Sequence, residues 1–267
     1  MYIIENKFLT EINPPPQNID SKVGLPYDPI KLLPSKSSAM YIVGEPASGK
    51  SSLITAMLYQ RKTKKKPNVN RMYYRFFDKI FLISPSLHTL NLDKLKLNPD
   101  RMHNRYSDEL LTEILEGLKE DDNENNLIIL DDSIRDISRK DKFFTKCVLN
   151  RRHCTQNEEK DGQAGLSLWV TSQAYKLMPL HLRVNFSDYI LFRTDKKSQR
   201  DAIRDELMAD LTKEQQDEVF KIAWKNKYDF LLIKGCEPTE NRYYAKFSKI
   251  VINKDNDENN SVENKKD

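Results

Sequence analysis

Short apolar runs separated by polar segments recur along the middle of the chain. Each run is rich in β-branched and aromatic residues, which is typical of strands buried inside a sheet. The runs predict strands over residues 39–43, 79–85, 126–130, 166–173, 188–193, 228–234 and 243–247. The last two are close together in sequence and predict an antiparallel hairpin at one edge of the sheet.

Helical spacing of apolar residues appears between these runs. It covers residues 52–59, the stretch from Ser107 to Leu118, and residues 196–225. Ser107, Asp108 and Glu109 give the second of these an acidic start, which suits the positive end of a helix dipole. The alternation of strands and helices predicts an α/β fold with a mostly parallel central sheet flanked by helices.

The two ends of the chain differ from this central region. Residues 1–35 contain repeated prolines and predict an extended strap, because proline disfavours a packed helix. Residues 36–252 are predicted to form a single domain. Residues 253–267 are polar, with few apolar side chains, and predict a disordered tail.

The bulk composition indicates the cellular environment of the protein but does not identify its function. The chain has 44 basic and 40 acidic residues, and the net charge of +4 is too small to indicate nucleic-acid binding by itself. The three cysteines lack Cys-x-x-Cys spacing, and Cys147, His153 and Cys154 lack a fourth metal ligand, so we expect structural thiols in a reducing, intracellular protein. No apolar stretch approaches the roughly 20 residues that cross a bilayer, so no membrane association is expected.

The strongest motif follows the predicted strand 39–43. The eight residues are Gly44-Glu45-Pro46-Ala47-Ser48-Gly49-Lys50-Ser51, and they match the phosphate-binding P-loop pattern Gly-x-x-x-x-Gly-Lys-Ser/Thr. Backbone N–H groups of such a loop point at the β- and γ-phosphates of a nucleotide such as ATP. The predicted nucleotide-binding segment extends through Ser52. Lys50 is expected to contact the terminal phosphates, and the Ser51 hydroxyl to ligate the Mg²⁺ ion that bridges them.

Two acidic residues follow the predicted strand 126–130. Asp131 and Asp132 match a Walker B strand end, where Asp131 would hold Mg²⁺ through water and Asp132 would polarise the water that attacks the γ-phosphate. The alternative is that Asp132 and Ser133 cap the start of the next helix.

A further polar strand end follows residues 166–171. Ser172 and Gln173 would meet the same edge of the sheet, where an amide can hydrogen-bond both the attacking water and the γ-phosphate. The alternative is that Gln173 is only a turn residue.

Taken in order, these motifs resemble those of the poxvirus-type genome-packaging ATPases. This family belongs to the FtsK–HerA superfamily and occurs in large DNA viruses and virophages. The matching elements are the P-loop, Asp131-Asp132, Asn150-Arg151-Arg152-His153, Ser172-Gln173, and the stretch from Leu182 to Arg200. The resemblance implies a RecA-like core that forms a ring, a pentamer or hexamer, and pumps double-stranded DNA into a preformed capsid. It also implies capsid or portal-vertex proteins as partners, and a location in the cytoplasmic viral factory or the virion.

The resemblance further implies an arginine donated to the neighbouring subunit's γ-phosphate. Of Arg151, Arg152, Arg183 and Arg200, we rank Arg183 and Arg200 first; for each, a surface ion pair is the alternative. Asp132 stands where many superfamily members carry glutamate. Candidate DNA contacts for the ring's inner surface, with a solvated loop as the alternative for the lysines, are Lys62, Lys64, Lys65, Lys66, Arg71, Arg151 and Arg152.

Two other functions use the same P-loop. A nucleotide or small-molecule kinase would need a mobile lid and arginines that clamp a second phosphate substrate. A non-catalytic nucleotide-binding scaffold would not need the acids at positions 131 and 132. Paired acids and a glutamine at successive strand ends favour the activation of water instead.

Overall fold

The computed structural model describes residues 2–4, 32–34, 37–59, 72–87, 97–120, 125–137, 141–151, 153–155 and 165–252. In these residues ten strands form one sheet, in the order β1-β10-β9-β8-β7-β2-β6-β5-β3-β4. The parallel strands are β2 (Ala39–Val43), β3 (Lys79–Ile83), β4 (Met102–His103), β5 (Asn125–Leu130), β6 (Gly165–Ser172) and β7 (Asp188–Phe192). The predicted, mostly parallel sheet is therefore confirmed.

An antiparallel extension completes the sheet beyond β7. It consists of β8 (Phe230–Lys234), β9 (Tyr243–Ala245), β10 (Ser248–Val251) and β1 (Tyr2–Ile4). The predicted hairpin is thus confirmed as β8 and β9, although β8 starts two residues later than expected and leaves Tyr228 in the preceding loop.

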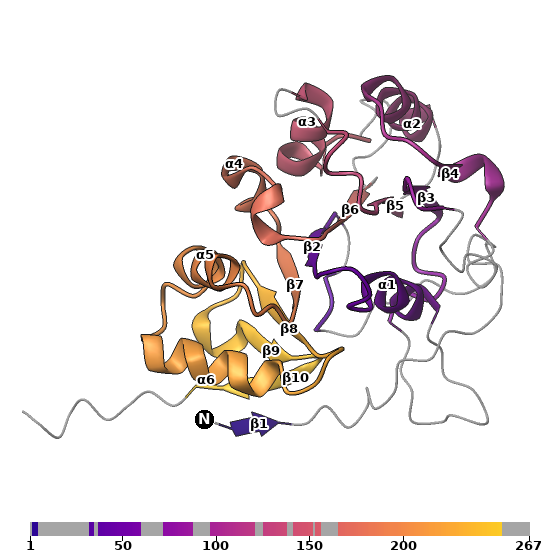
Figure 1. The fold of residues 1–267 in the computed structure, drawn as a ribbon. Helices are drawn as coiled ribbons and strands as arrows, with labels where there is room; N and C mark the ends of the chain where they lie inside the picture. Colours follow the sequence, from indigo (N-terminus) through magenta and orange to yellow (C-terminus); the bar gives the residue numbers. More distant parts are fainter. Residues whose placement is uncertain are drawn as a thin grey trace, which may run out of the picture.

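Helices cover both faces of the sheet (Figure 1). Met40 and Ile42 of β2 pack in one apolar cluster with α1 (Lys50–Tyr59), whereas Tyr41 and Val43 point into the cluster on the other face. That second cluster includes side chains from α2 (Asp108–Glu120), α3 (Lys142–Asn150), α4 (Leu180–Arg183), α5 (Lys197–Leu207) and α6 (Lys213–Ala223). Because side chains alternate across a strand, β2 is buried on both faces. None of the helices in the described ranges is long and apolar enough to cross a membrane.

The helical segment predicted over residues 196–225 is present but interrupted. The structure has two helices, α5 and α6, with a break between Leu207 and Lys213. Thr212 causes the new start, because its hydroxyl accepts a hydrogen bond from the Gln215 backbone N–H while the Gln215 side chain accepts one from the Thr212 N–H. This reciprocal capping box outweighs the continuous helical spacing.

The start of the predicted strap has a defined structure. Tyr2–Ile4 pairs antiparallel with β10, so this part of the strap is an edge strand, visible beside β10 in Figure 1. Several predictions fall outside the described residues. They concern residues 5–31, the tail from residue 253, Arg152, Arg71 and the lysines at positions 62 and 64–66.

The strand order brings the predicted site residues to one edge of the sheet. β6 lies between β2, which leads into the P-loop, and β5, which Asp131 follows directly. Val43 pairs with Ser172, and Leu130 with Val170. The carboxyl ends of these three parallel strands therefore meet at the same edge, where α/β proteins bind ligands.

Candidate active site

The P-loop leaves β2 and turns tightly before α1. The Gly44 N–H donates a hydrogen bond to the Ser172 carbonyl (2.9 Å), and the Ser48 N–H donates one to the Glu45 carbonyl (3.1 Å). Ala47 and Gly49 have φ angles of 59° and 102°. The left-handed conformation at Gly49 explains why glycine stands there, since other residues rarely adopt it.

Gly44 has a different, steric reason to be glycine. A Cβ atom built on Gly44 would collide with Oγ of Ser48 and lie 2.9 Å from Cβ of Phe192. Phe192 ends β7, is 4% exposed and packs at a tilt against Phe230, so it cannot move away easily. The loop is therefore packed closely on the end of the neighbouring strand.

The Lys50 ammonium points back into this loop. Its Nζ donates hydrogen bonds to the carbonyls of Gly44 (2.7 Å) and Glu45 (3.4 Å), and the residue is buried. Burial lowers the pKa of Lys50, while the negative charges of Asp132 and Asp131 act to raise it. The charges of both acids therefore act on the Lys50 ammonium.

Asp131 is buried at the end of β5 and held by two hydroxyl groups. Its Oδ1 accepts a hydrogen bond from Thr171 Oγ1 (2.7 Å), and its Oδ2 accepts one from Ser84 Oγ (3.2 Å). Burial raises the pKa of Asp131, although both hydrogen bonds and the Lys50 charge oppose this effect. A cation bound nearby would act like the Lys50 charge and favour the ionised form of Asp131.

The structure brings Asp132 and Gln173 together. Gln173 Nε2 donates a hydrogen bond to Asp132 Oδ2 (3.3 Å), and the Asp132 N–H donates one to Thr171 Oγ1 (2.9 Å). Asp132 adopts a φ of 51°, which turns it out of the strand. No helix starts at Ser133, because the next described helix is α3, whose first turn is capped by Asp141. Helix capping therefore does not explain Asp132.

The residues present fit a nucleoside triphosphate with Mg²⁺. Among the described residues, Ser48 Oγ and Asp132 Oδ1 are buried without a hydrogen-bond partner. The Ser48 hydroxyl can donate to a phosphate oxygen, and the Asp132 carboxylate can accept from a water molecule. Ser51 and Asp131 are the residues that would hold Mg²⁺. No cluster of three or more His, Cys, Asp or Glu side chains suited to a metal is found in the described ranges.

Arg183 is held by partners within its own chain. It is 7% exposed, and its guanidinium contacts both carboxylate oxygens of Glu206 and the Met178 carbonyl (2.6 Å). All of these partners belong to the same domain, so the guanidinium faces inward. Arg151 also has internal partners, since it donates to the carbonyls of Ser37 (2.6 Å) and Val148 (3.0 Å).

Arg200 lies on α5, whose first turn borders the P-loop. Lys196, just before α5, forms an ion pair with Glu45 of the P-loop (3.2 Å). Between α5 and the P-loop is a small, partly open cleft, lined by Gly44, Glu45, Gln173, Thr194, Lys196 and Gln199 among others. Arg200 is partly exposed, and its Nε is buried without a hydrogen-bond partner among the described residues. A role for Arg200 in a neighbouring subunit stays a prediction.

Three residues of the site were not predicted from the sequence. Thr171 bridges the two acids, Ser84 binds Asp131, and Lys196 binds Glu45. Thr171 and Ser84 come at or directly after the ends of β6 and β3, which lie on either side of β5. Thr171 and Ser84 could have been identified from the sequence, because each is a hydroxyl residue at the end of a strand next to the strand that the acids follow.

Comparison with solved structures supports the same fold. The DNA-packaging ATPase B204 from Sulfolobus turreted icosahedral virus aligns with a TM-score of 0.55 and 15% identity, covering 82% of this chain and all of B204 (100%). The genome packaging NTPase B204 from Sulfolobus turreted icosahedral virus 2, in complex with ATP-gammaS, aligns with a TM-score of 0.51 and 16% identity, covering 81% of this chain and 98% of B204. The chain has a RecA-like P-loop ATPase fold. Its resemblance to viral genome-packaging ATPases, predicted from the motifs, is thus matched at the level of structure. No protein-family model and no curated protein matches the sequence.

Proposed function

We propose that this protein hydrolyses ATP with Mg²⁺ and uses the energy to move double-stranded DNA during packaging of a viral genome. The observation that carries the proposal is the hydrogen bond from Gln173 to Asp132 beside the buried Lys50. An amide and a carboxylate at adjacent strand ends, next to a phosphate-binding loop, are suited to positioning water for attack on a phosphate.

The proposed roles follow from the chemistry of each side chain. The P-loop, Gly44 through Ser52, binds the triphosphate through backbone N–H groups, and Lys50 neutralises charge on its terminal phosphates. Mg²⁺, held by Ser51 and Asp131, would draw charge from the phosphate oxygens. Asp132 orients the attacking water and accepts its proton, and Gln173 reports the presence of the γ-phosphate by hydrogen bonding.

We further propose that the active unit is a ring of five or six copies. In such a ring, an arginine of one copy reaches the nucleotide of the next, and Arg200 is favoured over Arg183 because the latter is buried in an internal ion pair. The other partners would be the capsid or portal-vertex proteins of the virus. The protein would act in the viral factory in the host cytoplasm or in the virion.

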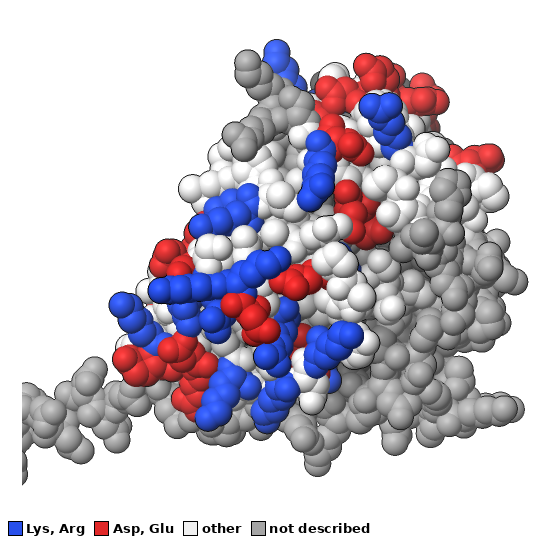
Figure 2. Space-filling model, viewed as in Figure 1, with Lys and Arg blue, Asp and Glu red and all other residues white. Residues whose placement is uncertain are grey.

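DNA is proposed as the moving substrate because B204, which shares the fold, is described as a DNA-packaging ATPase. A motor that must grip any sequence contacts phosphates with basic side chains. Lysines and arginines are frequent on the face in Figure 2 that carries α5 and α6, but acidic side chains interrupt them. The candidate DNA contacts therefore stay those named from the sequence, which are Lys62, Lys64, Lys65, Lys66, Arg71, Arg151 and Arg152.

The proposal is tested by measuring ATP hydrolysis with and without double-stranded DNA. DNA should raise the rate, and Lys50→Ala should lower hydrolysis by about 100-fold or more. Asp132→Asn should still bind ATP but lose turnover, which separates water activation from nucleotide binding. An ATPase rate unaffected by DNA would contradict translocation, and phosphoryl transfer to an added nucleoside would favour a kinase.

A further inference from the structure

A solvent-exposed aromatic ring lies against the P-loop. A Cβ atom built on Gly49 would be 3.6 Å from Cδ1 of Tyr228 and 3.7 Å from Cε1 of Phe192. The two aromatic residues differ in burial, because Phe192 is 4% exposed whereas Tyr228 is 59% exposed. Phe192 thus supports the loop from inside the protein, and Tyr228 borders the same glycine from the solvent side.

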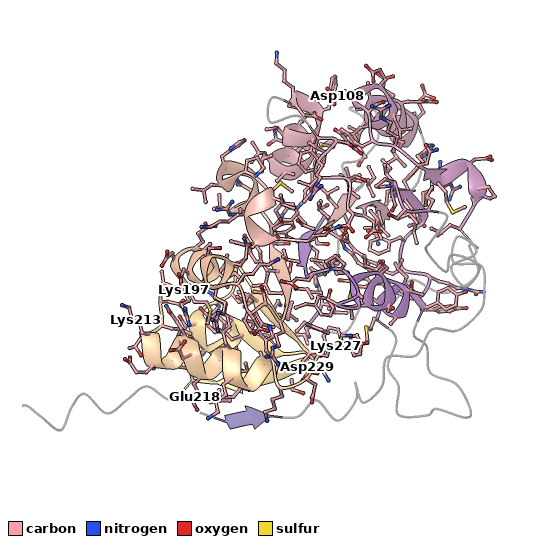
Figure 3. The ribbon with its side chains drawn as sticks, viewed as in Figure 1. Asp108, Lys197, Lys213, Glu218, Lys227 and Asp229 are labelled. Carbon is pink, nitrogen blue, oxygen red and sulfur yellow. The ribbon has the colours of Figure 1, made fainter. Side chains whose placement is uncertain are left out.

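Hydrogen bonds fix the loop that carries Tyr228. Asp229 is buried, and its carboxylate accepts two hydrogen bonds from Asn226 (both 2.9 Å) and pairs with Lys246 (2.6 Å). The Trp224 indole donates a hydrogen bond to the Leu191 carbonyl (2.9 Å), which ties the end of α6 to β7. Figure 3 shows Lys227 and Asp229 together at the end of α6 that is nearer to α1. Tyr228 is therefore held beside the P-loop by a braced turn.

The charge next to this ring suits an anionic ligand. Nζ of Lys227 lies 5.3 Å from the centre of the Tyr228 ring, within the range of a cation–π contact. In the part of the chain that the structure describes, the Tyr228 hydroxyl has no recorded hydrogen bond. Tyr228 is therefore accessible to a ligand despite its contacts with Gly49 and Lys227.

We infer that Tyr228 stacks on the base of the nucleotide whose phosphates the P-loop binds. This inference rests on the proposed binding of a nucleoside triphosphate. The phosphate chain fixes one end of the ligand at Gly49 and Lys50, so the rest of the nucleotide must lie beside the loop, where the aromatic ring is available. Every nucleobase has a π face, so stacking at Tyr228 strengthens binding of purine nucleotides without distinguishing ATP from GTP.

The test compares ATP with inorganic tripolyphosphate, which has the phosphates but no base. Calorimetric titration of the full chain with each ligand, in the presence of Mg²⁺, gives the dissociation constants. Tyr228→Ala should weaken ATP and GTP binding about tenfold and leave tripolyphosphate binding within about twofold. Tyr228→Phe, which keeps the ring, should retain the parent affinity for ATP.

Two further variants give the matched controls. Leu180→Ala removes another exposed apolar side chain, on α4, and should change neither affinity. Lys50→Ala should weaken both ligands, because it removes a phosphate contact. Equal ATP affinity in the parent and Tyr228→Ala would overturn base stacking, as would an equal loss of ATP and tripolyphosphate. If the parent protein binds neither ligand, the proposed function itself fails.

Discussion

The guanidinium of Arg183 holds both carboxylate oxygens of Glu206, with Nε 2.6 Å from Oε2 and a terminal nitrogen 2.5 Å from Oε1. The Tyr175 hydroxyl donates a third hydrogen bond to Glu206 (2.9 Å). Burial acts to raise the pKa of Glu206, but the hydrogen bonds from Arg183 and Tyr175 outweigh it, and the pKa is lowered. The pair connects the end of α4 to α5 and anchors Tyr175, which follows Gln173 by two residues.

Removing Glu206 should destabilise the domain. Glu206→Ala leaves the guanidinium of Arg183 without its partner in a site where the two side chains are only 9% and 18% exposed. We expect the free energy of unfolding to fall by about 3 kcal/mol, measured by urea denaturation. The control is Asp195→Ala, which breaks the exposed Arg193–Asp195 pair and should cost less than about 1 kcal/mol. Equal costs for the two variants would contradict the anchoring role of the buried pair.

The Thr171 hydroxyl should matter for turnover because it connects the two acids. It donates to Asp131 Oδ1 and accepts from the Asp132 N–H, so Thr171→Val leaves both groups without this partner. We expect a loss of about 1–3 kcal/mol in unfolding free energy, and a fall in kcat of about tenfold or more as Asp132 loses its position. Thr171→Ser keeps the hydroxyl and should retain most of the activity. Steady-state ATPase assays on both variants give the comparison, and an unchanged kcat in Thr171→Val would refute the positioning role.

Two glycines should respond in opposite ways to alanine. Gly44→Ala forces a methyl group against Ser48 and Phe192, so we expect a loss of about 1–3 kcal/mol in stability and at least tenfold weaker ATP binding. Gly117 lies in α2, and an added Cβ would meet no atom within 4 Å. Gly117→Ala should therefore stabilise the protein by about 0.5–1 kcal/mol. Thermal unfolding and ATP titration of both variants check the contrast; a Gly44→Ala protein with parental affinity would contradict it.

The sequence was informative wherever a residue's role follows from its place on a strand. The apolar run 39–43 became β2 with the same bounds, and Asp131, Asp132 and Gln173 all lie at the predicted edge. The reason is physical, because buried parallel strands must be short apolar runs and their carboxyl ends must meet at one edge.

Pairings between distant residues could not be predicted in the same way. Arg183 looks like any other arginine in the sequence, and only the packing of α4 against α5 brings it to Glu206. Thr171 resembles an ordinary strand residue until β5 and β6 are placed side by side. The break between α5 and α6 was readable from Thr212 and Gln215, but the continuous helical spacing obscured it.

Asp188 should make stability depend on pH. It is 2% exposed at the start of β7, opposite Lys234 of β8. Burial raises its pKa from 3.8 to about 6, while a hydrogen bond with Ser187 and the charges of Lys234 and Arg151 act to lower it. The folded state thus favours the neutral carboxyl, so the stability that this group contributes is complete below about pH 4 and is lost as pH rises through 6.

An asparagine at position 188 is neutral at every pH, so Asp188→Asn is the variant to compare with the parent protein. The unfolding free energy of Asp188→Asn, relative to the parent, should therefore rise between pH 4 and 7 and stay constant above that range. Urea denaturation of both proteins at half-unit pH steps measures the difference and cancels the other titrating groups. In a Lys234→Met background the rise should continue to higher pH, because a charge that lowers the Asp188 pKa is gone. A difference that falls with pH would mean that attraction to the Lys234 charge outweighs burial.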